Sequence, residues 1–68
     1  ITLPEATTSC TLLLGLLDAD ARYTLLTAEG NVVKEGNITT SLLHLDTAGV
    51  AYIDIYGVDR LFETVINK

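Results

Sequence analysis

The sequence contains no methionine or tryptophan and only one cysteine. A single thiol cannot close a disulfide within the chain, so the covalent bridges that hold many small secreted domains together are excluded. We expect Cys10 to lie in the interior as a small apolar side chain. Aromatic residues are also scarce. With three tyrosines and one phenylalanine, a core has to be built mainly from leucine, isoleucine and valine.

Basic side chains are scarce as well. Four lysines and arginines stand against nine acidic residues, which gives a formal net charge of −5. Nucleic acids and anionic membrane surfaces are bound through clusters of Lys and Arg, so neither is an expected partner.

Long hydrophobic runs are missing too. The apolar stretch 12–17 is interrupted by Gly15 and is far shorter than the roughly 20 residues that span a bilayer, so membrane insertion is not expected. The sequence also opens without Met and without the basic segment of a signal peptide. We therefore expect it to begin inside a longer protein or after processing.

The most regular stretch that is present predicts a β-hairpin. Residues 22–28 and 32–37 are rich in Thr, Tyr, Val and Leu, and residues 29–31 between them contain Gly30. Two such runs joined by a short segment with Gly are typical of a hairpin, because Gly adopts the positive φ that the turn requires. The remaining segments are interpreted as strands added to this pair.

The other strands are expected at residues 8–17, 42–45, 50–56 and 61–66, with turns at 18–20, 46–49 and 57–60. Residues 51–56 alternate most clearly between apolar and polar, which predicts a strand with one buried face. The leucines of 12–17 also fit a helical stripe, but the short length and the threonines favour a strand. The sequence therefore predicts an all-β, small Ig-like antiparallel β-sandwich of about six to seven strands. We expect one domain, 1–68, in which residues 1–9 form a linker or an edge strand.

Residues for chemistry are few. His44 is the only histidine, and its position between two leucines of a predicted strand places it on the solvent side rather than in a catalytic pair with Cys10. Asp18 and Asp20 have the spacing of the first two ligands of a calcium-binding loop. Arg22 occupies the position of the third ligand, so a solvated turn is expected. No catalytic, cofactor or metal site is predicted, and the protein is not expected to be an enzyme.

Two weaker patterns also occur in the sequence. Tyr23, Tyr52 and Tyr56 would form a platform for stacking sugars if they shared an exposed face, although tyrosines in strands more often cover the edges of a core. Asn37 begins an Asn-Ile-Thr glycosylation pattern, which has meaning only in a eukaryotic secretory route, and we treat it as chance.

The order of these segments resembles the C-terminal sorting domains of the type IX secretion system of Bacteroidetes. Those domains have a strand that starts with Tyr, a Gly turn and a Val-Val-Lys strand that ends at Gly, matched by residues 23–36. A Leu-x-Leu strand and a turn ending in Gly follow, matched by 43–49. A further strand and a last strand that closes on Lys are matched by 50–55 and 64–68. The resemblance covers roughly the last two-thirds of the chain.

This resemblance implies a folded export signal. An outer-membrane translocon would recognise the surface of the domain, and a sortase-like peptidase would cut near residues 1–9, so the protein would pass through the periplasm to the cell surface or the medium. The positions carried over as recognition residues are Gly30, Gly49, Ile53, Ile55, Val65, Ile66 and Lys68. An unpaired edge strand would also allow strand addition or a homodimer.

Two departures from the family pattern keep an alternative open. Ala51 stands where the family has Tyr, and Asp54 replaces a usual Lys. The alternative is a non-catalytic Ig-like module, structural or carbohydrate-binding, of a larger extracellular Bacteroidetes protein.

Overall fold

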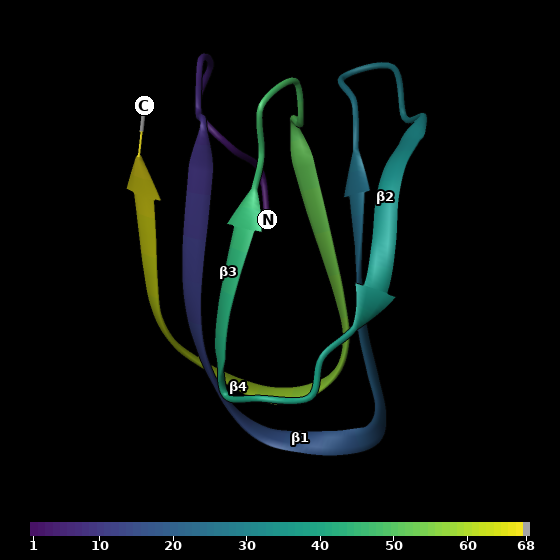
Figure 1. Ribbon diagram of the computed structural model, residues 1–68, viewed down its shortest axis with the longest axis vertical. Helices are drawn as coiled ribbons and strands as arrows, with labels where there is room; N and C mark the ends of the chain where they lie inside the picture. The colour runs from purple at the N-terminus through teal and green to yellow at the C-terminus, as the bar shows by residue number, and fades with distance from the viewer. Residues whose placement is uncertain (68) are drawn as a thin grey trace.

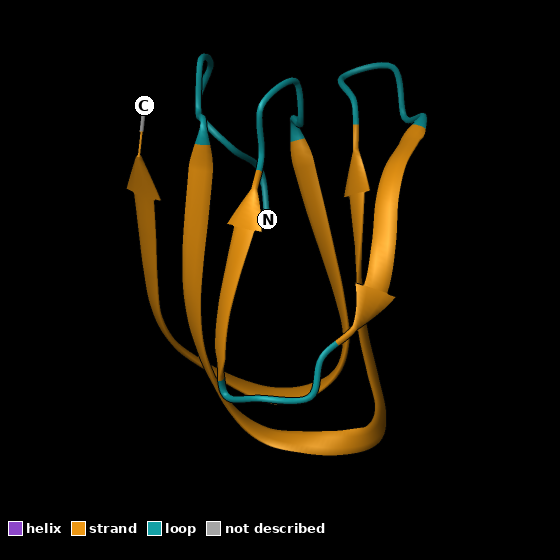
Figure 2. Ribbon diagram, in the orientation of Figure 1, coloured by secondary structure: helices purple, strands orange, loops and turns teal. Residues whose placement is uncertain are grey.

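The computed structural model describes residues 1–67 as an all-β structure, and no helix occurs among them. It has four strands: β1 (Ser9–Leu26), β2 (Val32–Asn37), β3 (Leu42–Asp46) and β4 (Tyr52–Asn67). Figure 2 shows that short loops join these strands at the ends of the molecule. The prediction of an all-β fold is therefore confirmed, as are the hairpin formed by β1 and β2 and the position of β3.

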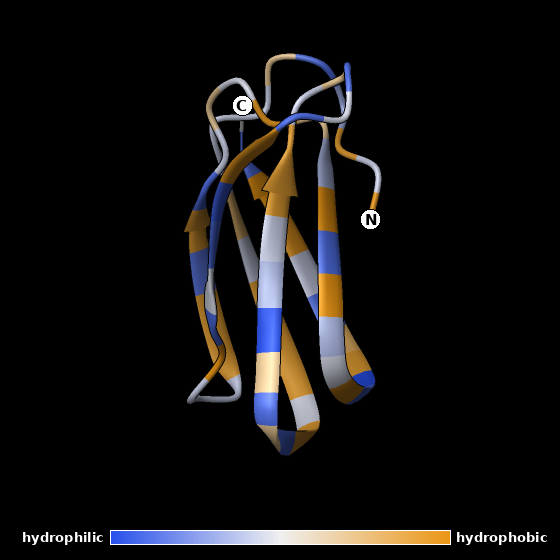
Figure 3. Ribbon diagram, turned by 90° about the vertical axis from the view of Figure 1, so that its right-hand side faces the viewer, coloured by the Kyte–Doolittle hydropathy of each residue, from blue (hydrophilic) through white to orange (hydrophobic). Residues whose placement is uncertain are grey.

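All four strands belong to one antiparallel sheet in which β1 pairs with each of the others. The first part of β1 lies between β3 and the end of β4, and the last part lies between β2 and the start of β4. Because β1 and β4 both bend sharply, the sheet folds back over itself (Figure 1). Apolar and polar residues alternate along the strands (Figure 3), as expected when one face of each strand is buried.

The bend in β1 changes which residues point inward. Before the bend the even-numbered Leu12 and Leu14 are buried, whereas after it the odd-numbered Tyr23 and Leu25 are buried. The pairing of β1 with β4 shifts register between Leu17 and Arg22, which is where this change of phase occurs. An irregular insertion of this kind bends a strand and redirects its side chains. The change lets both parts of β1 face the same core.

The bend in β4 lies directly against the bend in β1. Gly57 has a φ of 77°, a conformation that side-chain-bearing residues rarely adopt. A Cβ atom on Gly57 would lie 2.8 Å from the Cα atom of Ala21. Glycine therefore permits both the turn of the β4 backbone and its close approach to β1.

The folded sheet encloses one cluster of buried apolar side chains. β1 supplies most of its members, and none comes from β2 or from residues 54–67: Leu3, Cys10, Leu12, Leu14, Ala21, Tyr23, Leu25, Ile38, Leu45, Val50 and Ile53. Leucine and isoleucine dominate, as the composition predicts.

Residues 1–9, predicted to be a linker or an edge strand, are joined to the sheet at two points. Thr2 forms an antiparallel bridge with Tyr52, and Leu3 and Thr7 are buried. Thr7 also donates a hydrogen bond from its hydroxyl to the carbonyl of Pro4 at 2.5 Å. The segment 1–3 thus extends the sheet beside the start of β4.

Two predicted turns are wrong. Residues 18–20 and 57–60 were expected to end strands, but β1 and β4 continue through them. Polar residues and glycine mark both positions correctly as places where the chain changes direction. The change is a bend within a continuous strand, however, so residues 1–67 contain four strands in place of the six to seven expected.

In residues 1–67, no helix is long and apolar enough to cross a membrane.

Candidate recognition surface

Cys10 and His44 lie on opposite faces of the sheet and cannot act as a nucleophile and its base. Cys10 is fully buried, and burial raises the pKa of its thiol by desolvation. His44 is exposed, and its ring Nδ1 lies 2.8 Å from the hydroxyl of Thr11. Cys10 and Leu45 are register partners whose side chains face the core. His44 lies on the solvent side of β3. The solvent-facing position predicted for His44 is confirmed, as is burial of Cys10.

The two aspartates of the bend in β1 do not gather other ligands. Asp18 and Asp20 are exposed. Within residues 1–67, no three His, Cys, Asp or Glu side chains come close enough together to hold a metal ion.

The three tyrosines do not form one platform. Tyr23 is buried in the core, whereas Tyr52 and Tyr56 are exposed. Tyr52 and Tyr56 lie on the outward side of β4 with Asp54 between them. The guanidinium carbon of Arg22 lies 4.6 Å from the centre of the Tyr56 ring, which is within the range of a cation–π interaction.

The recognition residues carried over from the resemblance do not form one surface. Gly30 and Gly49 both have positive φ, of 87° and 79°, and they occupy the loops after β1 and β3. Ile53 is fully buried and Ile55 is half-buried against the core. Val65 and Ile66 are partly exposed near the end of β4. Lys68 lies outside the described residues. Ile53 therefore packs in the core and exposes no side-chain surface to solvent.

A group of exposed apolar side chains lies on the outer side of β3, β1 and the end of β4, together with the polar Thr11 and the acidic Glu63. We call it the outer apolar face, and its members are Leu13, Leu42, Phe62 and Val65, which are 38%, 61%, 63% and 44% exposed. Leu13 of β1 is the register partner of Leu42 in β3 and of Glu63 in β4, and Thr11 is that of Val65. A shallow hollow of about 150 Å³ lies among Thr11, Leu13, Leu42, Glu63 and Val65.

Phe62 joins this face through an irregularity in β4. The register of β1 with β4 shifts between Leu13 and Leu14, so Phe62 is an extra residue on β4. Its ring lies over Gly15, where an added Cβ atom would be 2.5 Å from the ring. The missing side chain of Gly15 thus makes room for an aromatic ring on the outside of the sheet. Exposed apolar patches on a protein surface commonly mark interaction sites.

Sequence reasoning did not single out Leu13, Leu42 and Phe62, although a signal for exposed apolar residues was present. The run 12–17 is apolar at both odd and even positions, apart from Gly15, which is more than one buried strand face requires. The structure covers only the face that carries Leu12 and Leu14. Leu13 and Leu16 of this run are left exposed.

Comparison of the chain with protein-family models, with curated proteins and with solved structures found no match.

Proposed function

We propose that this protein is a C-terminal secretion and sorting domain, recognised as a surface by the type IX machinery of Bacteroidetes. The observation that carries the proposal is the outer apolar face, which is uncovered on a domain whose Cys10 and His44 are kept apart. An exposed apolar patch suits a domain that is bound by another protein. The ordered resemblance of residues 23–68 to such sorting domains supplies the kind of partner.

The expected Ig-like β-sandwich is part of the same proposal. When the two parts of β1 and of β4 are counted separately, six strand segments form two three-stranded halves around one core. This arrangement supports a small Ig-like β-sandwich, the fold that the resemblance implies.

Processing by a sortase-like peptidase would be restricted by the way residues 1–9 are attached. A peptidase needs an extended, accessible backbone, whereas residues 1–3 pair with β4. The turn at Glu5 and Ala6 is exposed and lies outside these paired residues, so a peptidase could reach it and draw it out into an extended form. Within residues 1–9 we therefore place the accessible peptide bonds at this turn.

A fusion experiment tests the proposal. The domain is attached to the C-terminus of a periplasmic reporter in a strain that has the type IX pathway, and the reporter is assayed on intact cells. We expect it at the cell surface, and we expect deletion of residues 64–68 to leave it in the periplasm. Retention of the intact fusion in the periplasm, with the domain folded, would overturn the proposal.

The alternative, a structural or carbohydrate-binding module, has one observation in its favour. Tyr52 and Tyr56 are both exposed on the outward side of β4, where aromatic rings are able to stack on sugars. The sequence of the parent gene distinguishes the two proposals. Further domains encoded after Lys68 would favour the module, because an export signal of this type has to come last.

A further inference from the structure

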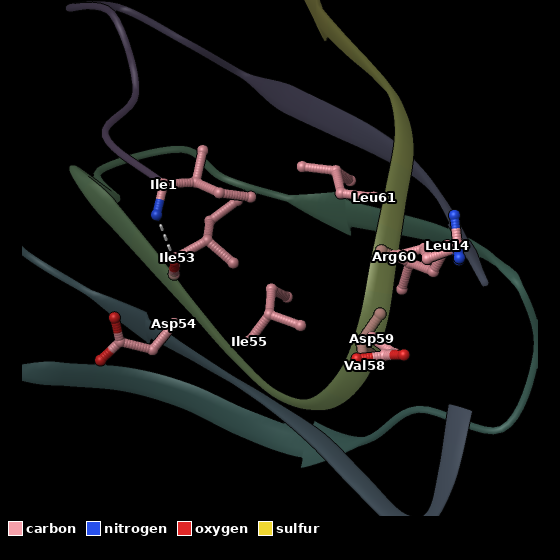
Figure 4. A pocket seen from close by; sticks show the side chains of 9 residues that line it. All are labelled: Ile1, Leu14, Ile53, Asp54, Ile55, Val58, Asp59, Arg60 and Leu61. Atoms are coloured by element: carbon pink, nitrogen blue, oxygen red, sulfur yellow. Dashed lines mark hydrogen bonds between the residues drawn. The ribbon is translucent and has the colours of Figure 1, made fainter. Parts of the chain in front are cut away.

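A groove opens between the two parts of β4, on the side where the folded sheet is not closed. It has a volume of about 400 Å³, and its apolar lining includes Ile1, Ile53, Ile55 and Leu61. Figure 4 shows the side chains of Ile1, Ile53 and Leu61 pointing toward one another across it. Leu61 is half-exposed even though it is the register partner of the buried Leu14. The groove therefore leaves part of the inward apolar surface in contact with water.

The hydrogen bonds of Ile1 show how a strand would fill this groove. The amino nitrogen of Ile1 donates to the carbonyl of Ile53 at 2.8 Å, and the amide of Ile53 donates to the carbonyl of Ile1 at 2.9 Å. These two bonds form the hydrogen-bonded pair of an antiparallel ladder. Residues before Ile1, if they continued this ladder, would run beside Asp54, Ile55 and Tyr56.

The backbone of Ile55 is ready for such a continuation. Backbone groups of alternate residues in a strand point to the same side, so the N–H and C=O of Ile55 point as those of Ile53 do, away from β1. In residues 1–67, β4 pairs with β1 and, at Tyr52, with Thr2. The next pair of the ladder, opposite Ile55, is therefore open.

We propose that the groove is the seat of the residues that join this domain to its cargo, bound as an extension of the strand that begins at Ile1. The inference rests on the proposed function, in which the cargo is attached at the amino end of the domain. The occupant is the connecting segment itself because its direction and register are already set by the pairing of Ile1 with Ile53. A separate peptide would have to meet the same ladder without that connection.

The register also assigns a chemistry to each seated residue. The residue immediately before Ile1 lies opposite Asp54, whose side chain is exposed, so it faces outward and is expected to be basic or polar. The residue two before Ile1 lies opposite Ile55, so its side chain enters the groove beside Leu61. It is expected to be Val, Ile or Leu, because an apolar side chain there removes the exposed part of Leu61 from water.

Amide exchange on the purified domain tests the inference. The probe is the 68-residue chain with Ser-Thr-Val-Lys added before Ile1, which places Lys opposite Asp54 and Val opposite Ile55. The control carries Ser-Thr-Asp-Lys, which has the same length but a charged residue in the groove. We expect the Val extension to slow exchange of the Ile55 amide by about tenfold relative to the unextended chain, and the Asp extension to leave it unchanged.

Two results would overturn the inference. The first is equal protection of Ile55 by the Val and Asp extensions. The second is protection of Ile55 in the unextended chain that grows with protein concentration, which would assign the groove to a second copy. The measurement is independent of export. A fusion that fails to reach the surface while Ile55 is protected contradicts the proposed function alone, and an exported domain without this protection contradicts the groove alone.

Discussion

At the scale of single residues, two glycines with the same backbone conformation have different surroundings. Gly57 and Gly30 have φ values of 77° and 87°. An added Cβ atom at Gly57 meets the backbone of Ala21 at 2.8 Å, whereas at Gly30 no atom lies within 4 Å. The two positions therefore separate the cost of a left-handed backbone from the cost of a steric clash.

Substitution by alanine should resolve these two costs. Gly30→Ala introduces only backbone strain and should lower the free energy of unfolding by about 1 kcal/mol. Gly57→Ala adds the contact with Ala21, and the loss should reach about 3 kcal/mol or abolish folding. Urea unfolding followed by circular dichroism measures both values. Equal losses would show that β1 and β4 are not in close contact at their bends.

The buried thiol of Cys10 makes stability depend on pH. Burial raises its pKa above the ordinary value of a cysteine, so the unfolded chain loses its thiol proton at a lower pH than the folded chain does. As the pH rises past the ordinary pKa of about 8.5, the unfolded state binds fewer protons and the free energy of unfolding falls. Below that pH, Cys10 contributes no slope.

Urea titrations at a series of pH values from about 7 to 9.5 should show this decline in the native protein. In Cys10→Ala the part of the slope due to the thiol should be absent, because no thiol titrates in either state. A native protein whose stability parallels that of Cys10→Ala over this range would mean that the thiol is exposed.

At the scale of the elements, the leucines of 12–17 are compatible in sequence with either a strand or a helix, and in the structure they belong to the strand β1. On a helix, Leu12 and Leu16 would share one face, since they are four residues apart. In the structure Leu12 is fully buried and Leu16 is exposed. The two leucines therefore have different roles despite their spacing.

Alanine substitution of these leucines has a clear expected outcome. Leu12→Ala removes core packing and should cost about 3 kcal/mol of unfolding free energy, while Leu16→Ala should change it by less than about 0.5 kcal/mol. The urea midpoints of the two variants give the comparison. Similar losses for both would support the helical stripe and contradict the sheet.

The elements that the sequence predicts correctly are those in which local signals agree. The hairpin has Gly30 between two β-rich runs, and the segment 50–56 alternates with period two, so turn chemistry and side-chain pattern point to the same answer. The bends of β1 and β4 were predicted as turns because Asp18, Asp20 and Gly57 carry the same local signal in a bend as in a hairpin. Only the pairing of β1 with β4 across the bend distinguishes the two cases.

At the scale of the whole molecule, the outer apolar face depends on strand pairings between residues that are distant in sequence. Leu13, Leu42 and Phe62 come from three strands, and the sheet topology places them on one face. No pattern along the chain joins these three residues, and the residues carried over from the resemblance include Val65 of this face but also the buried Ile53. The sequence does indicate that residues 12–17 contain more apolar side chains than one buried face requires.

The central claim, that the outer apolar face is what an export machinery recognises, is tested most directly by two matched substitutions in the reporter fusion. Leu42→Asp changes this face, and Val32→Asp changes β2 in the other half of the sheet at a residue of similar exposure, 58% against 61%. Circular dichroism should show that both variants fold. We predict that Leu42→Asp lowers reporter activity at the cell surface about tenfold, as expected for loss of an apolar contact at a binding surface, and that Val32→Asp leaves it near the native level. Equal export of the two variants would contradict the account.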